Sequence, residues 1–138
     1  MSPTVMGLDP GSRRIGVAVS DGSGKIAMPK AVIDRTAASY IDELSAIVKE
    51  SAVSEVVVGL PLNMDGSEGP SARSARDFAA EIEKELDLPV RLLDERLTTV
   101  SVQSSMRRSG VTSRDQKGKI DKVAATLILQ SFLDSRTT

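Results

Sequence analysis

The order in which hydrophobic patterns follow one another constrains the fold of this chain most. Three β-rich runs come first, over residues 5–8, 15–19 and 26–33, and the turn at 21–24 between the last two is typical of a hairpin. Because short turns join all three runs, we predict an antiparallel meander. Pro29 has no backbone N–H to donate, so we expect the third strand to lie at an edge of the sheet or to carry a bulge.

The pattern then changes to helices alternating with strands. Apolar residues recur at helical spacing over 40–48 and 72–86, and Pro70 suits the first turn of the second helix. The apolar runs at 56–58 and 90–93 follow these helices and are predicted to be parallel strands. Further helices are predicted at 97–108 and 120–133, the latter apolar on most sides and therefore buried. We predict a loop over 109–118.

This order of elements predicts an α/β fold. It is a mixed five-stranded sheet with strand order 3-2-1-4-5, flanked by helices, and 138 residues predict one domain, 1–138. Ligands of such sheets bind beyond the carboxyl ends of the parallel strands. Asp9 follows the first strand and Glu95 follows the fifth, so we expect both acids at that edge. The last helix must cross this edge to bring Asp121 within reach.

The residue types that are missing restrict the chemistry. The chain has no His and no Cys, which excludes Ser-His-Asp and Cys-His catalysis and zinc sites built from these residues. Carboxylate oxygens remain, and they select Mg²⁺ or Mn²⁺, ions that most often act on phosphate esters. Zero Cys also fits a reducing cytoplasm.

No apolar run approaches the ~20 residues that span a bilayer, and no leader pattern of basic then apolar residues opens the chain. We therefore expect a cytoplasmic protein with no membrane segment. We also expect it to be a monomer or a homodimer.

The charge is divided unevenly along the chain, although the net charge is only −1. Residues 34–87 hold five basic and twelve acidic side chains, whereas residues 91–122 hold eight basic and four acidic ones. The basic stretch surrounds Glu95 and Asp121 and would attract a polyanion such as nucleic acid. A solvated face with helix C-terminal cations is the simpler interpretation. Aromatic residues make up only 2%, which argues against an aromatic platform for bases.

Each candidate motif has a structural alternative. Asp9 begins a turn in which Gly11 would let the backbone approach an anion, although an ordinary hairpin would also place an Asp there. Asn63 and Asp65 lie in the 59–66 segment, where they would bind substrate or, as composition alone favours, simply build a turn. Asp121 alone would be an acid favoured by the helix dipole. Together with Asp9 and Glu95, it supplies the third carboxylate that a two-metal site needs.

The cluster at 94–99 also permits two interpretations. Glu95 is a candidate metal ligand, and Arg96 is a candidate bidentate partner for phosphate. Alternatively, Asp94 or Thr98 caps a helix and Arg96 is a solvated charge. Both interpretations can hold together, because a cap requires only one of these residues.

Four motifs in order give the chain a resemblance to a known family. They are LDPGSRRIGVA at 8–18, VGLPLNMDGS at 58–67, DERLTT at 94–99, and IDKVAA at 120–125 followed by ILQ at 128–130. The chain resembles the YqgF/RuvX family of the RNase-H-like superfamily, described as Holliday-junction resolvases and as pre-16S ribosomal RNA nucleases. The resemblance implies that Asp9, Glu95 and Asp121 are the catalytic acids. It also implies that Arg14, Asn63 and Arg96 lie near the path of the phosphates.

From these observations we expect a metal-dependent nuclease that hydrolyses phosphodiester bonds in structured nucleic acid. Its three acids would hold two Mg²⁺ or Mn²⁺ ions roughly 4 Å apart. The favoured substrate is a ribosomal RNA precursor, processed at the 5′ end of pre-16S rRNA, and the alternative is resolution of Holliday junctions in branched DNA. Two alternatives of another class stay open: a non-catalytic nucleic-acid-binding module, and an actin-like nucleotide-binding half-domain, whose phosphate motif has a similar Asp-x-Gly turn.

The segment 109–119 is expected to contact the substrate as a mobile loop. It carries Arg114, Lys117 and Lys119 and almost no apolar residue that would anchor it. We expect these cations to close over a phosphate backbone and to carry Asp121 towards the metal ions.

Overall fold

Five strands form one mixed sheet in the computed structural model, which describes the backbone of residues 3–97 and 114–136 and the side chains of residues 3–96 and 122–136. The sheet has the order β3-β2-β1-β4-β5, which confirms the predicted order. Strand β1 pairs antiparallel with β2 and parallel with β4, β2 pairs antiparallel with β3, and β4 pairs parallel with β5. The strands are β1 (Thr4–Pro10), β2 (Arg14–Ser20), β3 (Ala27–Asp34), β4 (Val53–Leu60) and β5 (Val90–Asp94).

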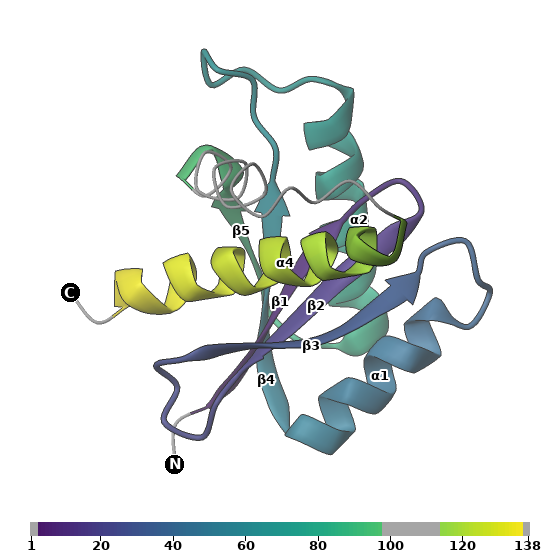
Figure 1. The fold of residues 1–138 in the computed structure, drawn as a ribbon, viewed down its shortest axis with the longest axis vertical. Helices are drawn as coiled ribbons and strands as arrows, with labels where there is room; N and C mark the ends of the chain where they lie inside the picture. The colour runs from purple at the N-terminus through teal and green to yellow at the C-terminus, as the bar shows by residue number, and fades with distance from the viewer. Residues whose placement is uncertain (1–2, 98–113, 137–138) are drawn as a thin grey trace.

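Helices cover both faces of this sheet. Helices α1 (Tyr40–Ser51) and α2 (Pro70–Leu86) pack on one face, and α4 (Arg114–Arg136) lies across the strands on the other (Figure 1). A single 3₁₀ turn, η1 (Glu95–Leu97), follows β5 directly. None of these helices, within the described part of the chain, is long and apolar enough to cross a membrane.

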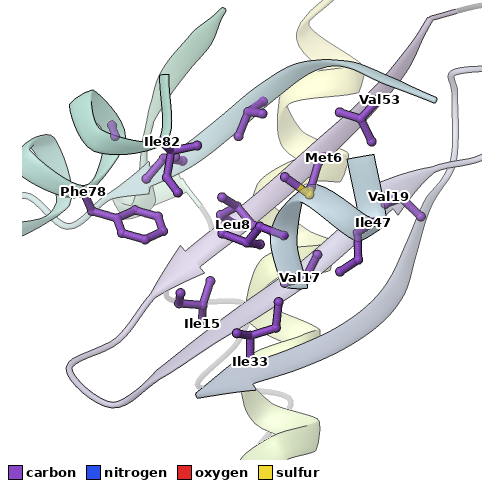
Figure 2. Packing of buried hydrophobic residues seen from close by; sticks show 14 residues of the cluster. Met6, Leu8, Ile15, Val17, Val19, Ile33, Ile47, Val53, Phe78 and Ile82 are labelled. Atoms are coloured by element: carbon purple, nitrogen blue, oxygen red, sulfur yellow. The ribbon is translucent and has the colours of Figure 1, made fainter. Parts of the chain in front are cut away.

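The alternation of side chains along the strands separates two cores. Met6 and Leu8 of β1 belong to the larger core, where Figure 2 shows Phe78 and Ile82 of α2 beside Leu8. Val5 of β1 instead packs with α4. Since side chains alternate between the faces of a strand, position 9 shares the α4 face with position 5. Asp9 therefore lies on the side of the sheet that α4 covers.

Two glycines let α4 approach that face closely. A Cβ added at Gly7 of β1 would lie 2.7 Å from the Cβ of Leu129, and one at Gly59 of β4 would lie 2.6 Å from the Cδ1 of Ile128. Both distances are shorter than carbon atoms tolerate. The helix consequently rests on the backbone of β1 and β4 at these two points.

Polar contacts fix the direction of α4 across the sheet. Glu55 of β4, 8% exposed, accepts from Arg136 of α4 (2.8 Å) and from Arg91 of β5 (3.1 Å). At the edge strand β3, the Gln130 side chain accepts from the N–H of Ala27 (2.9 Å). These contacts fix α4 on β4 and on β3 and so set the position of its preceding turns.

The predicted loop over 109–118 is wrong for its second half. Helix α4 begins at Arg114, so Gly118 is helical, and residues 109–113 lie outside the described part of the chain. Low apolar content misled the prediction, because helix formation is cooperative and a packed helix extends through polar turns at its end. The helix predicted over 97–108 lies outside the described residues except for Leu97, which ends η1.

Candidate functional site

The carboxyl groups of Asp9 and Glu95 meet on the α4 face of the sheet. Asp9 belongs to β1, Glu95 begins η1 after β5, and β4 lies between these two strands. The Glu95 carboxylate occupies the space where a side chain at Gly59 of β4 would be. Because Gly59 has no Cβ, Glu95 reaches across β4 and forms a hydrogen bond with Asp9.

This arrangement changes the acidity of Glu95. Burial raises the pKa of Glu95 to about 8, aided by the negative charge of Asp9, by their hydrogen bond and by the charge of Asp94. Burial disfavours the charged form of Glu95, and the neighbouring carboxylates disfavour a further negative charge beside their own. The pair therefore shares a proton near neutral pH, and a bound cation would take that proton's place.

The third predicted acid lies on α4. Asp121 is helical, but its side chain is outside the described part of the structure. By the helical repeat, position 121 shares a face of α4 with Ala125 and Ile128, both buried against the sheet. Among the side chains that are described, no three His, Cys, Asp or Glu gather as metal ligands would. The role of Asp121 stays a prediction.

Arg14 begins β2 on the same face of the sheet. Ile15 and Val17 of β2 point into the larger core, so the alternation places position 14 on the α4 face. Asp9 pairs with Gly16, two residues along the strand from Arg14. Arg14 therefore lies on the same face of the sheet as the acid pair, and its proximity to phosphate stays a prediction.

Arg96 is held by its neighbour Asp94. Its Nε lies 2.9 Å and its Nη2 lies 2.7 Å from the Oδ2 of Asp94, and its backbone N–H donates to Oδ1 at 2.9 Å. The Arg96 side chain lowers the pKa of Asp94 through these hydrogen bonds. The cap by Asp94 is confirmed, whereas Arg96 is held on Asp94 rather than freely solvated. Phosphate binding by Arg96 stays a prediction. Asp94 was not predicted as a partner of Arg96.

Asn63 is used inside its own loop. Its Nδ2 donates to the Oγ of Ser67 (3.0 Å), and its backbone N–H donates to the carbonyl of Ser67 (2.9 Å). Asp65 accepts from the N–H and the Oγ of Ser67 at 2.9 and 2.6 Å. These hydrogen bonds build the turn that the composition of this segment favours. Substrate binding by Asn63 stays a prediction.

The three cations of the predicted substrate loop lie in the first turns of α4. Arg114, Lys117 and Lys119 are helical, and their side chains are outside the described part of the structure. The helical repeat places positions 114, 117 and 121 on one face and position 119 on nearly the opposite face. Closure of a mobile loop is therefore not available to residues 114–119.

Comparison of the sequence with known proteins points to one family. A family model described as "RuvX: Holliday junction resolvase" matches residues 3–135. A protein of Anaeromyxobacter sp. (strain K) is 45% identical over 132 residues, 95% of this chain and 96% of that one. A protein of Halothermothrix orenii is 45% identical over 131 residues, 94% of each chain. Both carry the name "Putative pre-16S rRNA nuclease".

Among solved structures, the similarity extends to a more distant protein. T. thermophilus RuvC in complex with Holliday junction substrate matches with a TM-score of 0.57 and 15% identity, over 99% of this chain and 96% of that one. At this identity the match shows a common fold, with the same mixed sheet flanked by helices.

Proposed function

Because this chain belongs to the RuvX family, we propose that it is a metal-dependent nuclease that hydrolyses phosphodiester bonds in structured nucleic acid. Asp9, Glu95 and Asp121 are the catalytic acids in this proposal. Its favoured substrate is the 5′ end of pre-16S rRNA.

One observation carries the proposal: the carboxyl groups of Asp9 and Glu95 are in contact. Two such groups cannot both ionise without mutual repulsion, and burial together with the negative charge of Asp9 raises the pKa of Glu95 to about 8. A divalent cation removes the repulsion, and ligands made only of oxygen favour Mg²⁺ or Mn²⁺. The donor set therefore fits these ions.

The residues then divide between holding metal and orienting substrate. Asp9, Glu95 and Asp121 would hold Mg²⁺ or Mn²⁺, expected as two ions, which supply activation of water and stabilisation of the leaving oxygen. Arg14 shares the α4 face with Asp9, and Arg96 directly follows Glu95. We assign both arginines to the phosphate backbone, which positions a substrate without reading its sequence.

The names of the relatives support the choice of substrate. Two proteins that match this chain almost end to end are named for pre-16S rRNA, whereas the family model is named for Holliday junctions. We place the ribosomal RNA precursor first and resolution of branched DNA second.

The test compares both substrates with one protein preparation. Purified protein is incubated with RNA spanning the 5′ junction of the 16S precursor, or with a four-way DNA junction, in Mg²⁺, Mn²⁺ or EDTA. We expect cleavage of the RNA with metal and none in EDTA. Faster cutting of the DNA junction would favour the second substrate. Binding without cleavage in Mn²⁺ would favour a non-catalytic module, and ATP hydrolysis in place of cleavage would favour an actin-like half-domain.

A further inference from the structure

Met64 projects into solvent from the loop that follows β4. Its exposed fraction is 92%, compared with 57% for Ile26 and 42% for Met28, the next most exposed large apolar residues that the structure describes. Single exposed apolar residues are common on protein surfaces. Met64 differs because hydrogen bonds order the loop around it and because Arg96, the residue after Glu95, contacts that loop.

Hydrogen bonds fix the shape of the loop formed by residues 63–67. The backbone carbonyl of Asn63 accepts from the N–H of Gly66 (2.8 Å), and its side-chain amide donates to the Oγ of Ser67. The Asp65 carboxylate accepts from both the N–H and the Oγ of Ser67. Gly66 adopts a φ of 87°, which residues with a side chain rarely adopt. A fixed tip presents its side chain without paying the entropy of ordering a loop on binding.

Arg96 connects this tip to the candidate site. Its Nη1 lies 3.4 Å from the carbonyl oxygen of Met64, and a Cβ at Gly66 would lie 3.4 Å from the same nitrogen. The other edge of the guanidinium is fixed on Asp94, next to Glu95. Arg96, whose side chain is 39% exposed, therefore lies against the backbone of the residue that carries the apolar tip, and it directly follows Glu95 of the acid pair in the chain.

This pairing suits one kind of ligand. A cation holds the phosphate backbone, and an apolar side chain beside it can enter between two bases, as Met does in proteins that kink or unstack nucleic acid. A thioether also makes favourable contacts with aromatic rings. In a chain with only 2% aromatic residues, Met64 is the described side chain best placed for this contact.

We infer that Met64 is a specificity-determining residue that inserts at an unstacked or distorted base step of the substrate. The inference rests on the proposed function, because it assumes that nucleic acid binds at the acid pair. It gives a physical reason why structured nucleic acid would be preferred: insertion costs less where stacking is already broken.

The experiment measures base unstacking without cleavage. An RNA hairpin with a bulge and a continuous duplex of the same sequence each carry 2-aminopurine, whose fluorescence rises on unstacking, and binding is measured in EDTA. We expect the wild type to raise the signal of the bulged hairpin. Met64→Ala should lose that rise and about tenfold in affinity for the bulged hairpin. Met64→Leu should keep most of both, and Met64→Gln should resemble Met64→Ala.

Ile26→Ala is the matched control, since Ile26 is also exposed but lies in the β2–β3 turn. A signal that survives in Met64→Ala, or an equal loss in Ile26→Ala, would overturn the inference. Because the readout needs no cleavage, unstacking by an inactive protein would reject only the nuclease proposal. Cleavage without unstacking would reject only the role of Met64, and failure to bind either RNA would reject both.

Discussion

Gly59 decides how two distant acids meet. Strand β4 separates β1 from β5, so a side chain at the facing position of β4 would stand between Asp9 and Glu95. Glycine leaves that position open, and the Glu95 carboxylate fills it. The sequence could predict that both acids lie at the same edge of the sheet, because each follows a strand. It could not predict the contact, which depends on a missing Cβ in a third strand.

Asp9→Asn is expected to abolish cleavage and to leave the fold intact. The amide keeps the shape of the side chain but removes a metal ligand, and the loss of transition-state stabilisation should reduce the rate about a thousandfold or more. Cleavage in Mn²⁺ is the measurement. Asp77→Asn, an exposed position in α2 on the opposite face of the sheet, should leave the rate unchanged. Wild-type cleavage by Asp9→Asn would reject the catalytic assignment.

Gly59→Ala is expected to separate the acid pair. The new Cβ would occupy the place of the Glu95 carboxylate and would lie 2.6 Å from Ile128, so either Glu95 or α4 must move. We expect a loss of about 1–3 kcal/mol in the free energy of unfolding, as in other overpacked sites, together with weaker Mn²⁺ binding.

Denaturation and calorimetric titration with Mn²⁺ measure both effects of Gly59→Ala. Gly22→Ala is the control, because a Cβ at Gly22 meets nothing within 4 Å. If Gly59→Ala bound Mn²⁺ as tightly as the wild type does, the acid pair would not be the metal site.

At the level of elements, strands were easier to predict than the start of the last helix. Pro29 was expected at an edge or a bulge, and β3 is an edge strand whose register with β2 shifts between Val17 and Ala18, next to Pro29. The start of α4 was missed because its first turns contain polar residues and Gly118. No local signal in this segment reveals a helix that is anchored further along, by Gln130 and Arg136.

The helical start of α4 sharpens the prediction for its cations. Positions 114 and 117 share the face of Asp121, whereas position 119 does not. Replacing Arg114 and Lys117 together by Gln should weaken binding to all nucleic-acid sequences. It should also flatten the salt dependence by up to about two counterions.

Lys119→Gln is the matched control for this double variant and should change the salt slope less. Dissociation constants measured over a range of salt concentrations test this prediction. An unchanged slope in the double variant would remove the start of α4 from the substrate path.

At the level of the whole molecule, the strand order followed from few rules. A meander followed by right-handed crossovers leaves few ways to arrange five strands, and the observed order is the expected one. The lengths were less certain, since β4 runs from Val53 to Leu60 although only residues 56–58 showed an uninterrupted β-branched run. The paired hydrogen bonds between the Arg96 guanidinium and the Asp94 carboxylate could not be predicted, because they depend on side-chain conformation rather than on the sequence pattern.

The acid pair should also control how the stability of the whole molecule depends on pH. The pKa of Glu95 is raised from 4.5 to about 8. Between these values the folded protein holds a proton that the unfolded chain releases, so without metal the free energy of unfolding should fall as pH rises through this window. The full loss above pH 8 is on the order of 5 kcal/mol.

Five other described carboxyl groups have pKa values shifted in the opposite direction. Hydrogen bonds lower the pKa values of Asp21, Asp34, Asp65, Glu68 and Asp94, so their contribution is present at neutral pH and is lost only in acid. The chain has no His that would titrate between pH 5 and 8. A decline in stability across that interval would therefore report mainly on Glu95.

Urea denaturation at pH 6 and pH 8, in EDTA and in Mn²⁺, tests this prediction. We expect the protein in EDTA to be less stable at pH 8 than at pH 6, and Glu95→Gln to remove most of that difference. Glu85→Gln, at an exposed position of α2, should keep it. Mn²⁺ should stabilise the wild type more at pH 8, where less protonated carboxyl remains to compete with the metal. Equal stabilisation at both pH values, with no effect of Glu95→Gln, would mean that Mn²⁺ binds elsewhere.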